Sequence, residues 1–203
     1  MLDRTFITLF KPSLQHMAAV LVRAGVGADA VTLAGFGLGL GGATAIALGE
    51  PLLGLLLILL SRLADGLDGA VARLTRPTDR GAFLDITLDF VFYASIPLAF
   101  AVADPVANAL PAAVLLAAFT GTASSFLAFA LLAERRGLSN ADYPQKGFYY
   151  LGGLTEATET LICFALMCLW PMHFGWWAYG FAVLCAMTLA TRLFAGWQLL
   201  RER

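Results

Sequence analysis

Long runs of apolar residues alternate with short polar breaks along most of this 203-residue chain. About 20 consecutive apolar residues are enough for an α-helix to cross the hydrocarbon core of a bilayer. By this criterion six segments are long enough to span a membrane: residues 30–49, 51–74, 81–103, 108–133, 147–170 and 175–200. The pattern therefore predicts an all-α, polytopic membrane protein with six transmembrane helices.

The N-terminal residues follow a different pattern. Apolar residues recur at roughly helical spacing between Leu2 and Leu21, but charged residues such as Arg4 and Lys11 lie among them. This arrangement is typical of an amphipathic helix that lies at a membrane surface. We expect residues 1–28 to form this interfacial helix and residues 29–203 to form the six-helix bundle. No linker divides the chain, so residues 1–203 are predicted to be a single domain.

The basic residues indicate which side of the membrane each predicted loop faces, because Lys and Arg favour cytoplasmic loops. The three loops near residues 50, 104 and 172 contain no Lys or Arg. The other loops and the two ends of the chain contain ten: Arg4, Lys11, Arg23, Arg76, Arg80, Arg135, Arg136, Lys146, Arg201 and Arg203. Both termini are therefore predicted to be cytoplasmic.

Composition agrees with the membrane class. The chain is 60% hydrophobic and 13% charged, whereas about 25% of residues are charged in a typical soluble domain. The net charge of −1 provides no basic surplus to meet a phosphate backbone, so we expect no nucleic-acid partner. In the first predicted span, Gly35 and Gly39 have the spacing of small residues that lets two helices pack closely.

Four aspartates lie within the second and third predicted spans. Asp65 and Asp68 are three residues apart, and Asp85 and Asp89 are four apart, so each pair shares one face of a helix. The short turn around Pro77 should make the two helices antiparallel neighbours. At about 1.5 Å per residue, Asp68 lies roughly 10 Å from the turn and Asp89 roughly 13 Å. The four carboxylates are therefore predicted to converge just inside the cytoplasmic boundary.

Four unpaired carboxylates at this depth would be costly, since one acid in the bilayer centre costs about 2.5–3.5 kcal/mol on insertion scales. A divalent cation would remove this cost. Oxygen ligands suit hard ions, so the acids predict a metal site, with Mg²⁺ the first candidate and Mn²⁺ the second. The alternative is that the acids only form ion pairs with Arg62, Arg73 and Arg80.

Small residues lie next to the acids. Gly69 directly follows Asp68 and leaves room beside the predicted metal, and Gly81 does the same on the next helix. Arg73 offers a forked cation that suits a phosphate. These features favour a pyrophosphate-bearing ligand whose tail lies in the membrane.

The string Asp65-xx-Asp68-Gly69-xx-Ala72-Arg73, followed by Gly81-xxx-Asp85-xxx-Asp89, resembles the signature of the CDP-alcohol phosphatidyltransferases. All eight signature residues are present in order. Seven residues separate Arg73 from Gly81, where the family commonly has eight, and this difference falls in the turn at Pro77. Upstream, Asp29-Ala-Val-Thr32 falls where many relatives have a Pro-Asn-x-x-Thr/Ser stretch, although Asp29 has a second interpretation as a helix N-cap.

The resemblance implies a role for each matching residue. Asp65, Asp68 and Asp85 would hold the metal, and Asp89 would act as general base and also touch a metal. The CDP-lipid pocket would include Thr32, Gly69, Ala72, Arg73 and Gly81. The implied reaction transfers a phosphatidyl or related lipid phosphate group from a CDP-linked lipid, such as CDP-diacylglycerol, to an alcohol acceptor and releases CMP. The family is usually homodimeric.

The acceptor is open among glycerol 3-phosphate, an inositol phosphate, serine and a second lipid. Relatives that use a phosphorylated acceptor have basic residues at positions similar to Arg135, Arg136, Lys146 and Arg192. The preference of basic residues for the cytoplasmic side explains Arg135 and Arg136 equally well. Arg192 is the stronger candidate, because an arginine inside an apolar span is costly and usually functional.

Two glutamates, Glu156 and Glu159, lie three residues apart in the predicted fifth span. We interpret them either as ligands of the acceptor or as structural partners of Arg192.

Two other functions fit the same residues. The acids could form the ion path of an intramembrane divalent-cation transporter, but they cluster at one face. The chain could also be an inactive relative that only binds CDP-lipid, although the intact Asp89 argues against this. We therefore predict a metal-dependent transferase of phospholipid biosynthesis in a bacterial inner membrane, with its active site at the cytoplasmic face.

Overall fold

The computed structural model describes residues 2–136 and 155–201, and side chains from residue 12 onward. The described residues form seven α-helices and one short 3₁₀ helix: α1 (Leu2–Arg23), α2 (Ala28–Ala47), α3 (Pro51–Leu74), α4 (Asp79–Ala103), α5 (Pro105–Arg135), α6 (Ala157–Leu169), η1 (Pro171–His173) and α7 (Phe174–Leu199). No strand occurs among them. The predicted all-α class is confirmed.

Within the described residues, four segments are long and apolar enough to cross a membrane: α2, α4, α5 and Pro171–Leu199, which combines η1 and α7. The chain is thus an all-α membrane protein. Helix α3 has 24 residues, which is sufficient length, but it carries the charged residues of the predicted site. Helix α6 has only 13 residues. Of the predicted fifth span, 147–170, residues 147–154 lie outside the described residues, and the predicted bounds are wrong at Thr155 and Glu156, which precede α6.

Local sequence explains where these helices begin and end. Pro51 and Pro105 stand at the starts of α3 and α5, where a missing N–H costs no helical hydrogen bond. The Thr78 hydroxyl caps α4 by accepting a hydrogen bond from the Gly81 N–H at 3.1 Å. Gly49 follows α2 with φ +86°, a left-handed conformation that favours glycine.

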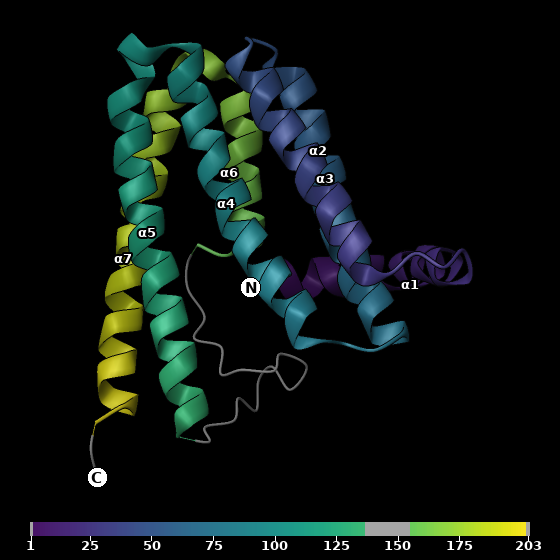
Figure 1. Ribbon diagram of the computed structural model, residues 1–203. Helices are drawn as coiled ribbons and strands as arrows, with labels where there is room; N and C mark the ends of the chain where they lie inside the picture. The colour runs from purple at the N-terminus through teal and green to yellow at the C-terminus, as the bar shows by residue number, and fades with distance from the viewer. Residues whose placement is uncertain (1, 137–154, 202–203) are drawn as a thin grey trace.

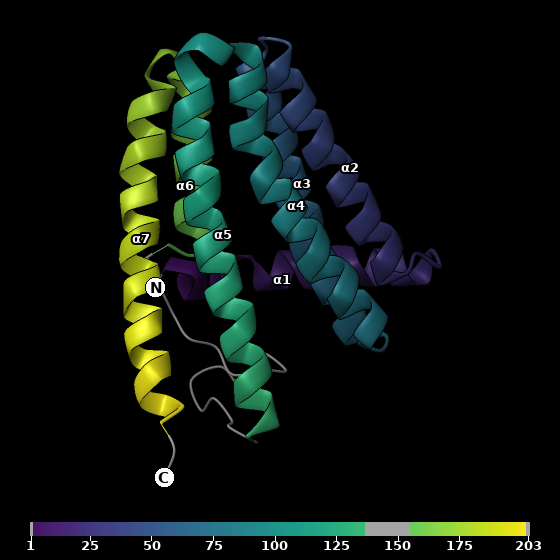
Figure 2. The ribbon, with the colours of Figure 1, turned by 60° about the vertical axis from the view of Figure 1, so that its left-hand side comes forward.

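The helices form a bundle whose connections separate into two ends (Figure 1). The α2–α3, α4–α5 and α6–α7 connections gather at the upper end of this view, and the α3–α4 turn lies at the opposite end. Helix α1 crosses the lower part of the bundle instead of running along it, as both ribbon views show (Figure 2). The three connections at the upper end are the ones without Lys or Arg.

Packing differs between the two ends. Towards the upper end, aromatic side chains of α4, α6 and α7 form the core; Phe100 stacks on Phe174 with ring centroids 4.7 Å apart. Helix α2 packs closely on α3 through glycines, as predicted. A Cβ at Gly42 would lie 3.0 Å from the Gly54 carbonyl oxygen, and one at Gly35 would lie 2.9 Å from the Ala64 Cβ.

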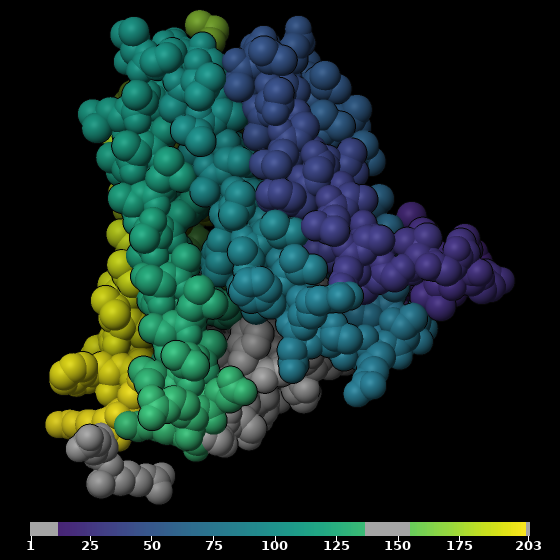
Figure 3. Space-filling view, in the orientation of Figure 1, coloured from purple at the N-terminus to yellow at the C-terminus, as the bar shows by residue number. Residues whose placement is uncertain are grey.

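Helix α1 packs against the lower end of α3. Ala18 of α1 is fully buried with Ala70 and Val71 of α3 in a separate small core. The space-filling view shows α1 and the start of α2 projecting from one side of the bundle (Figure 3). The lower end of α3, which carries the predicted site, is therefore supported from outside the bundle.

Candidate metal and nucleotide site

Helices α3 and α4 bring the four aspartates together, but not by packing directly on each other. Helix α2 packs closely against both of them, and the direct α3–α4 contacts among the described residues are sparse. The predicted antiparallel neighbours therefore meet through long side chains, such as Arg62 of α3 and Asp89 of α4, more than through close backbone packing.

Three of the four aspartates converge as predicted. Asp65, Asp68 and Asp85 can each place one carboxylate oxygen within 4.8 Å of the others. Carboxylate oxygens from two helices at this spacing suit a hard divalent cation, because such ions take several oxygen ligands at about 2.0–2.6 Å. The chemistry of this set therefore fits the metal that the sequence predicted.

A residue of α2 supports this cluster. The Thr32 hydroxyl lies 2.6 Å from Asp68 Oδ2 and donates a hydrogen bond to it. Asp68 and Thr32 are both buried, so the hydroxyl fixes the orientation of the carboxylate away from bulk water. Partners of this kind orient ligands around metal ions in proteins.

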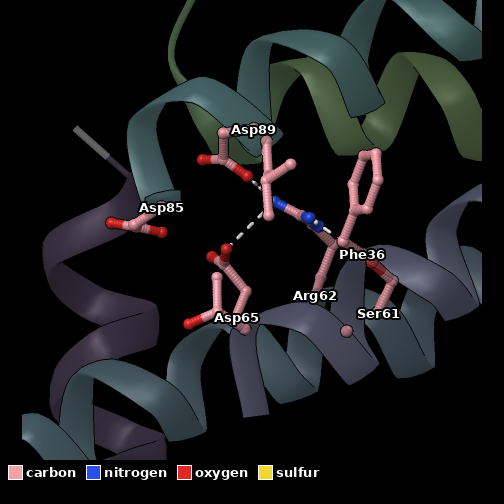
Figure 4. Close-up of a pocket in the computed structure, with 9 residues that line it drawn as sticks. Phe36, Ser61, Arg62, Asp65, Asp85 and Asp89 are labelled. Carbon is pink, nitrogen blue, oxygen red and sulfur yellow. Dashed lines mark hydrogen bonds and ion pairs between the residues drawn. The ribbon is translucent and has the colours of Figure 1, made fainter. Parts of the chain in front are cut away.

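The fourth aspartate, Asp89, is in a different environment. Its Oδ1 accepts a hydrogen bond from Arg62 Nη1 at 2.6 Å, and the same nitrogen lies 3.5 Å from Asp65 Oδ1. Figure 4 shows the guanidinium between these two carboxylates. The alternative that the acids form ion pairs is thus partly correct, since Arg62 pairs with two of them. Arg80 instead pairs with Asp29.

Two cavities adjoin the acids. The smaller, about 10 Å³, lies among Arg62, Asp65, Asp85 and Asp89 and has room for about one water-sized species (Figure 4). The larger, about 330 Å³, opens between the starts of α2 and α4 and the end of α3. Its volume is in the range of small-molecule pockets, about 300–1,000 Å³.

The larger cavity brings together most of the residues expected to bind CDP-lipid. Its lining includes Thr32, Gly69, Ala72 and Gly81, together with Asp68 and Asp85 of the acidic cluster. It also includes two arginines that sequence reasoning had not assigned to the pocket, Arg76 and Arg80. Arg73 does not line this cavity. The cavity and the metal cluster therefore share two carboxylates.

Two of the glycines in this cavity, Gly69 and Gly81, have little room for a side chain. A Cβ at Gly69 would lie 3.2 Å from Arg73 Nη1, so the guanidinium of Arg73 lies close to the Gly69 backbone. A Cβ at Gly81 would lie 3.2 Å from the Thr78 hydroxyl and 3.3 Å from Asp29 Oδ1. Asp29 is not the N-cap of α2, as one interpretation had it; Gly27 is, and Asp29 lies in the first turn.

The residues predicted to bind the acceptor lie elsewhere. Arg135 and Arg136 are exposed at the end of α5, and Lys146 lies outside the described residues. Arg192 is buried in α7, and its Nη1 donates to the Thr122 carbonyl of α5 at 3.1 Å. None of these described arginines lines either cavity.

Glu156 and Glu159 form a capping box at the start of α6. Glu156 is the N-cap, and its N–H donates to Glu159 Oε2 at 3.2 Å. The expectation that Glu156 lies inside a span is wrong, because capping requires it to precede the first turn. The sequence signal for this cap was the spacing of the two glutamates, three residues apart, just before the apolar run of α6.

Arg62, like Arg76 and Arg80, is a residue of the site to which the sequence analysis gave no functional role. Its position three residues before Asp65 places it on the same face of α3, and this spacing was visible in the sequence.

The fold and the acidic site define a class of protein. Residues 26–192 match the CDP-alcohol phosphatidyltransferase family, and the chain belongs to this family. The predicted enzyme class is confirmed. The chain is 50% identical to the inner membrane protein YnjF of Escherichia coli (strain K12) over 202 residues, which cover 100% of this chain and 98% of YnjF.

The fold is similar to that of phosphatidylinositol phosphate synthase PgsA1 of Mycobacterium tuberculosis. With the crystal structure of PgsA1 bound to CDP-DAG, the TM-score is 0.75 and the identity 22%, covering 94% of this chain and 98% of PgsA1. With the PgsA1 complex that contains manganese and citrate, the TM-score is 0.74 at 22% identity, and the match covers 94% of this chain and 93% of PgsA1. At this identity the likeness supports the fold alone.

Proposed function

We propose that this protein transfers a phosphatidyl or related lipid phosphate group from a CDP-linked lipid, such as CDP-diacylglycerol, to an alcohol acceptor. The observation that carries the proposal is that Asp68 and Asp85 belong both to the metal cluster and to the wall of the 330 Å³ cavity. A pyrophosphate in that cavity would therefore lie against the metal ligands. The relatives support it further, because PgsA1 binds CDP-DAG and, in another structure, manganese.

In this proposal Asp65, Asp68 and Asp85 hold the divalent ion, with Mg²⁺ or Mn²⁺ as the candidates. When bound, the ion supplies positive charge that offsets the charge of the pyrophosphate and of the departing nucleotide. Thr32 holds Asp68 in place. Gly69, Ala72 and Gly81 line the pocket for the cytidine diphosphate group, and Arg76 and Arg80 add positive charge to its wall. Arg73 does not line the cavity, but its guanidinium lies beside Gly69, from where we propose that it reaches the same group.

Asp89 is the proposed general base. The acceptor oxygen forms a bond to the lipid-side phosphorus, and the bond from that phosphorus to the bridging oxygen breaks, so that CMP leaves with the bonding electron pair. The hydroxyl proton passes to a carboxylate oxygen of Asp89, which requires hydrogen-bond reach of the acceptor. Asp89 lines the small cavity next to Asp65 and Asp85, and this position supports the assignment.

We further propose that α3 and α6 complete a set of six spans and that α1 lies at the cytoplasmic surface of a bacterial inner membrane. The name of the E. coli relative supports this location. Both termini would be cytoplasmic, and the protein would act as a homodimer. Arg135, Arg136, Lys146, Arg192, Glu156 and Glu159 remain predicted acceptor residues.

The test is release of CMP from CDP-diacylglycerol by the purified protein in detergent, with Mg²⁺ or Mn²⁺ and a panel of alcohol acceptors. We expect release that requires both metal and acceptor, stops with EDTA, and yields a lipid product that mass spectrometry identifies. Binding of CDP-diacylglycerol without CMP release from any acceptor would instead indicate an inactive relative. Metal-dependent cation flux in liposomes, without CMP release, would indicate a transporter.

A further inference from the structure

Arg62 occupies the space between the carboxylates of α3 and α4. Its Nη1 lies 2.6 Å from Asp89 Oδ1 and 3.5 Å from Asp65 Oδ1, so one nitrogen serves both acids. Figure 4 shows Asp85 facing the same space without an ion pair to Arg62. The acidic site therefore contains a cation of the protein's own beside Asp89.

Packing holds Arg62 in this position. Its side chain is only 14% exposed, and its Cζ lies 4.1 Å from the ring centroid of Phe92, which is fully buried. Its Nη2 donates to the Ser61 hydroxyl at 3.3 Å. A guanidinium over an aromatic face gains a cation–π interaction, which is stronger where water is excluded. Arg62 is therefore part of the packed interior rather than a side chain that moves freely.

This position limits how many ions the acids can bind. Enzymes that use two metal ions hold them about 3.5–4 Å apart, with carboxylates shared between them. A second ion beside the Asp65–Asp68–Asp85 cluster would need oxygens of Asp89 and Asp65, the two acids that Arg62 contacts. The guanidinium would also repel it. The cavity left beside Arg62 is about 10 Å³, space for one water-sized species.

We propose that Arg62 takes the place of a second cation, so that the site binds one divalent ion and Asp89 is positioned by arginine instead of by metal. Arg62 is then a positioning residue that acts through Asp89. The inference rests on the proposed function, because it assumes that Asp65, Asp68 and Asp85 bind a metal. Arg62, as long as it is present, keeps Asp89 from binding the metal.

The test counts Mn²⁺ ions bound to the purified full-length protein. Titration calorimetry gives the stoichiometry, and electron paramagnetic resonance distinguishes an isolated Mn²⁺ from a magnetically coupled pair. We expect one isolated ion per chain in the wild type. Arg62→Gln removes the charge at nearly constant size and should raise the number to two, with a coupled signal. Arg62→Lys keeps the charge and should leave it at one.

A double variant separates a specific effect from a general loosening of the site. If the second ion in Arg62→Gln uses Asp89, then adding Asp89→Asn should return the number to one. Two ions in the wild type, or one ion in a folded Arg62→Gln protein, would overturn the inference and leave the proposed function standing. No ion in the wild type would overturn both. If Arg62→Gln does not fold, the number of Mn²⁺ ions bound per wild-type chain decides between one ion and two.

Discussion

At the scale of single residues, the site shows two carboxylate environments that differ because of their neighbours. Asp68 accepts a hydrogen bond from a buried hydroxyl and faces two other acids, so a metal is the partner that would balance its charge. Asp89 already has a cationic partner in Arg62. The two aspartates thus differ in their partners: Asp68 has a hydroxyl and two neighbouring acids, and Asp89 has a guanidinium.

The general-base assignment predicts the effect of Asp89→Asn. An amide cannot take up the acceptor proton, so kcat should fall by about 10²–10⁴-fold. Binding of CDP-diacylglycerol should change by no more than a few fold, because Asp89 does not line the larger cavity. Turnover assays and ligand titrations measure the two effects separately. Loss of CDP-diacylglycerol binding would count against the base assignment.

The hydrogen bond from Thr32 predicts a change in metal affinity. Thr32→Val keeps the shape and removes the hydroxyl that orients Asp68, so Mn²⁺ affinity should fall by about 10–100-fold. Thr44→Val is the matched control, because Thr44 lies on the same helix and its hydroxyl donates to the Leu40 carbonyl of that helix. Calorimetric titration with Mn²⁺ measures both. Equal effects of the two variants would show that Thr32 does not act on the metal site.

At the scale of helices, the spacing of glycines in α2 determines how closely α3 and α4 approach. Gly35 and Gly42 face α3, and Gly39 lies against Phe92 of α4 and close to Ser61 of α3. Since α2 packs on both helices, it sets their separation and hence the space in which the four acids meet. Helix α2 contributes one polar contact to the acidic cluster, the Thr32–Asp68 hydrogen bond, and its packing also controls the geometry of the cluster.

Two glycines of α2 give a matched test of this packing. A Cβ at Gly39 would lie 2.5 Å from Phe92 Cδ2, so Gly39→Ala should destabilise the protein by about 1–3 kcal/mol. Gly37 has nothing within 4 Å of its added Cβ among the described residues, so Gly37→Ala should be neutral or slightly stabilising. Thermal unfolding in detergent compares them. Equal melting temperatures would contradict the close contact.

The predictions from sequence succeeded where helical periodicity determines the result. The spacing of Asp65 and Asp68 placed both on one face of α3, because residues three or four apart share a helix face. The short turn between α3 and α4 then accounted for Asp85 of α4 joining them. The pairing of Arg62 with Asp89 could not be predicted in the same way, because it depends on how α2 separates α3 and α4. The start of α6 was missed because apolar residues surround the capping box, and hydropathy does not distinguish a cap from a first turn.

At the scale of the whole molecule, the acids belong to the last part of α3 and the first part of α4. They therefore lie toward the end of the bundle that contains the α3–α4 turn and α1. The connections without basic residues lie at the other end. Structure and charge distribution thus give the protein two distinct faces, which agrees with the proposed active site at the cytoplasmic side.

Single cysteines introduced on the two faces test this orientation. Thr75→Cys lies in the α3–α4 turn and Glu50→Cys precedes α3, and both positions are exposed. In intact spheroplasts a membrane-impermeant maleimide should label Glu50→Cys and label Thr75→Cys only after permeabilisation. The native cysteines Cys163, Cys168 and Cys185 are buried, so the wild type is the background control. The reverse labelling pattern would place the site outside.

The contact of α1 with α3 has a consequence for the depth of the acids. Leu14 of α1 comes within 3.6 Å of the position a Cβ would take at Gly66, the residue that follows Asp65. With α1 at the membrane surface, as we propose, this contact ties the acids to the headgroup layer. Long helices adapt to thicker or thinner bilayers by tilting. The acids should then keep a constant distance from the aqueous boundary while the far ends of the helices move.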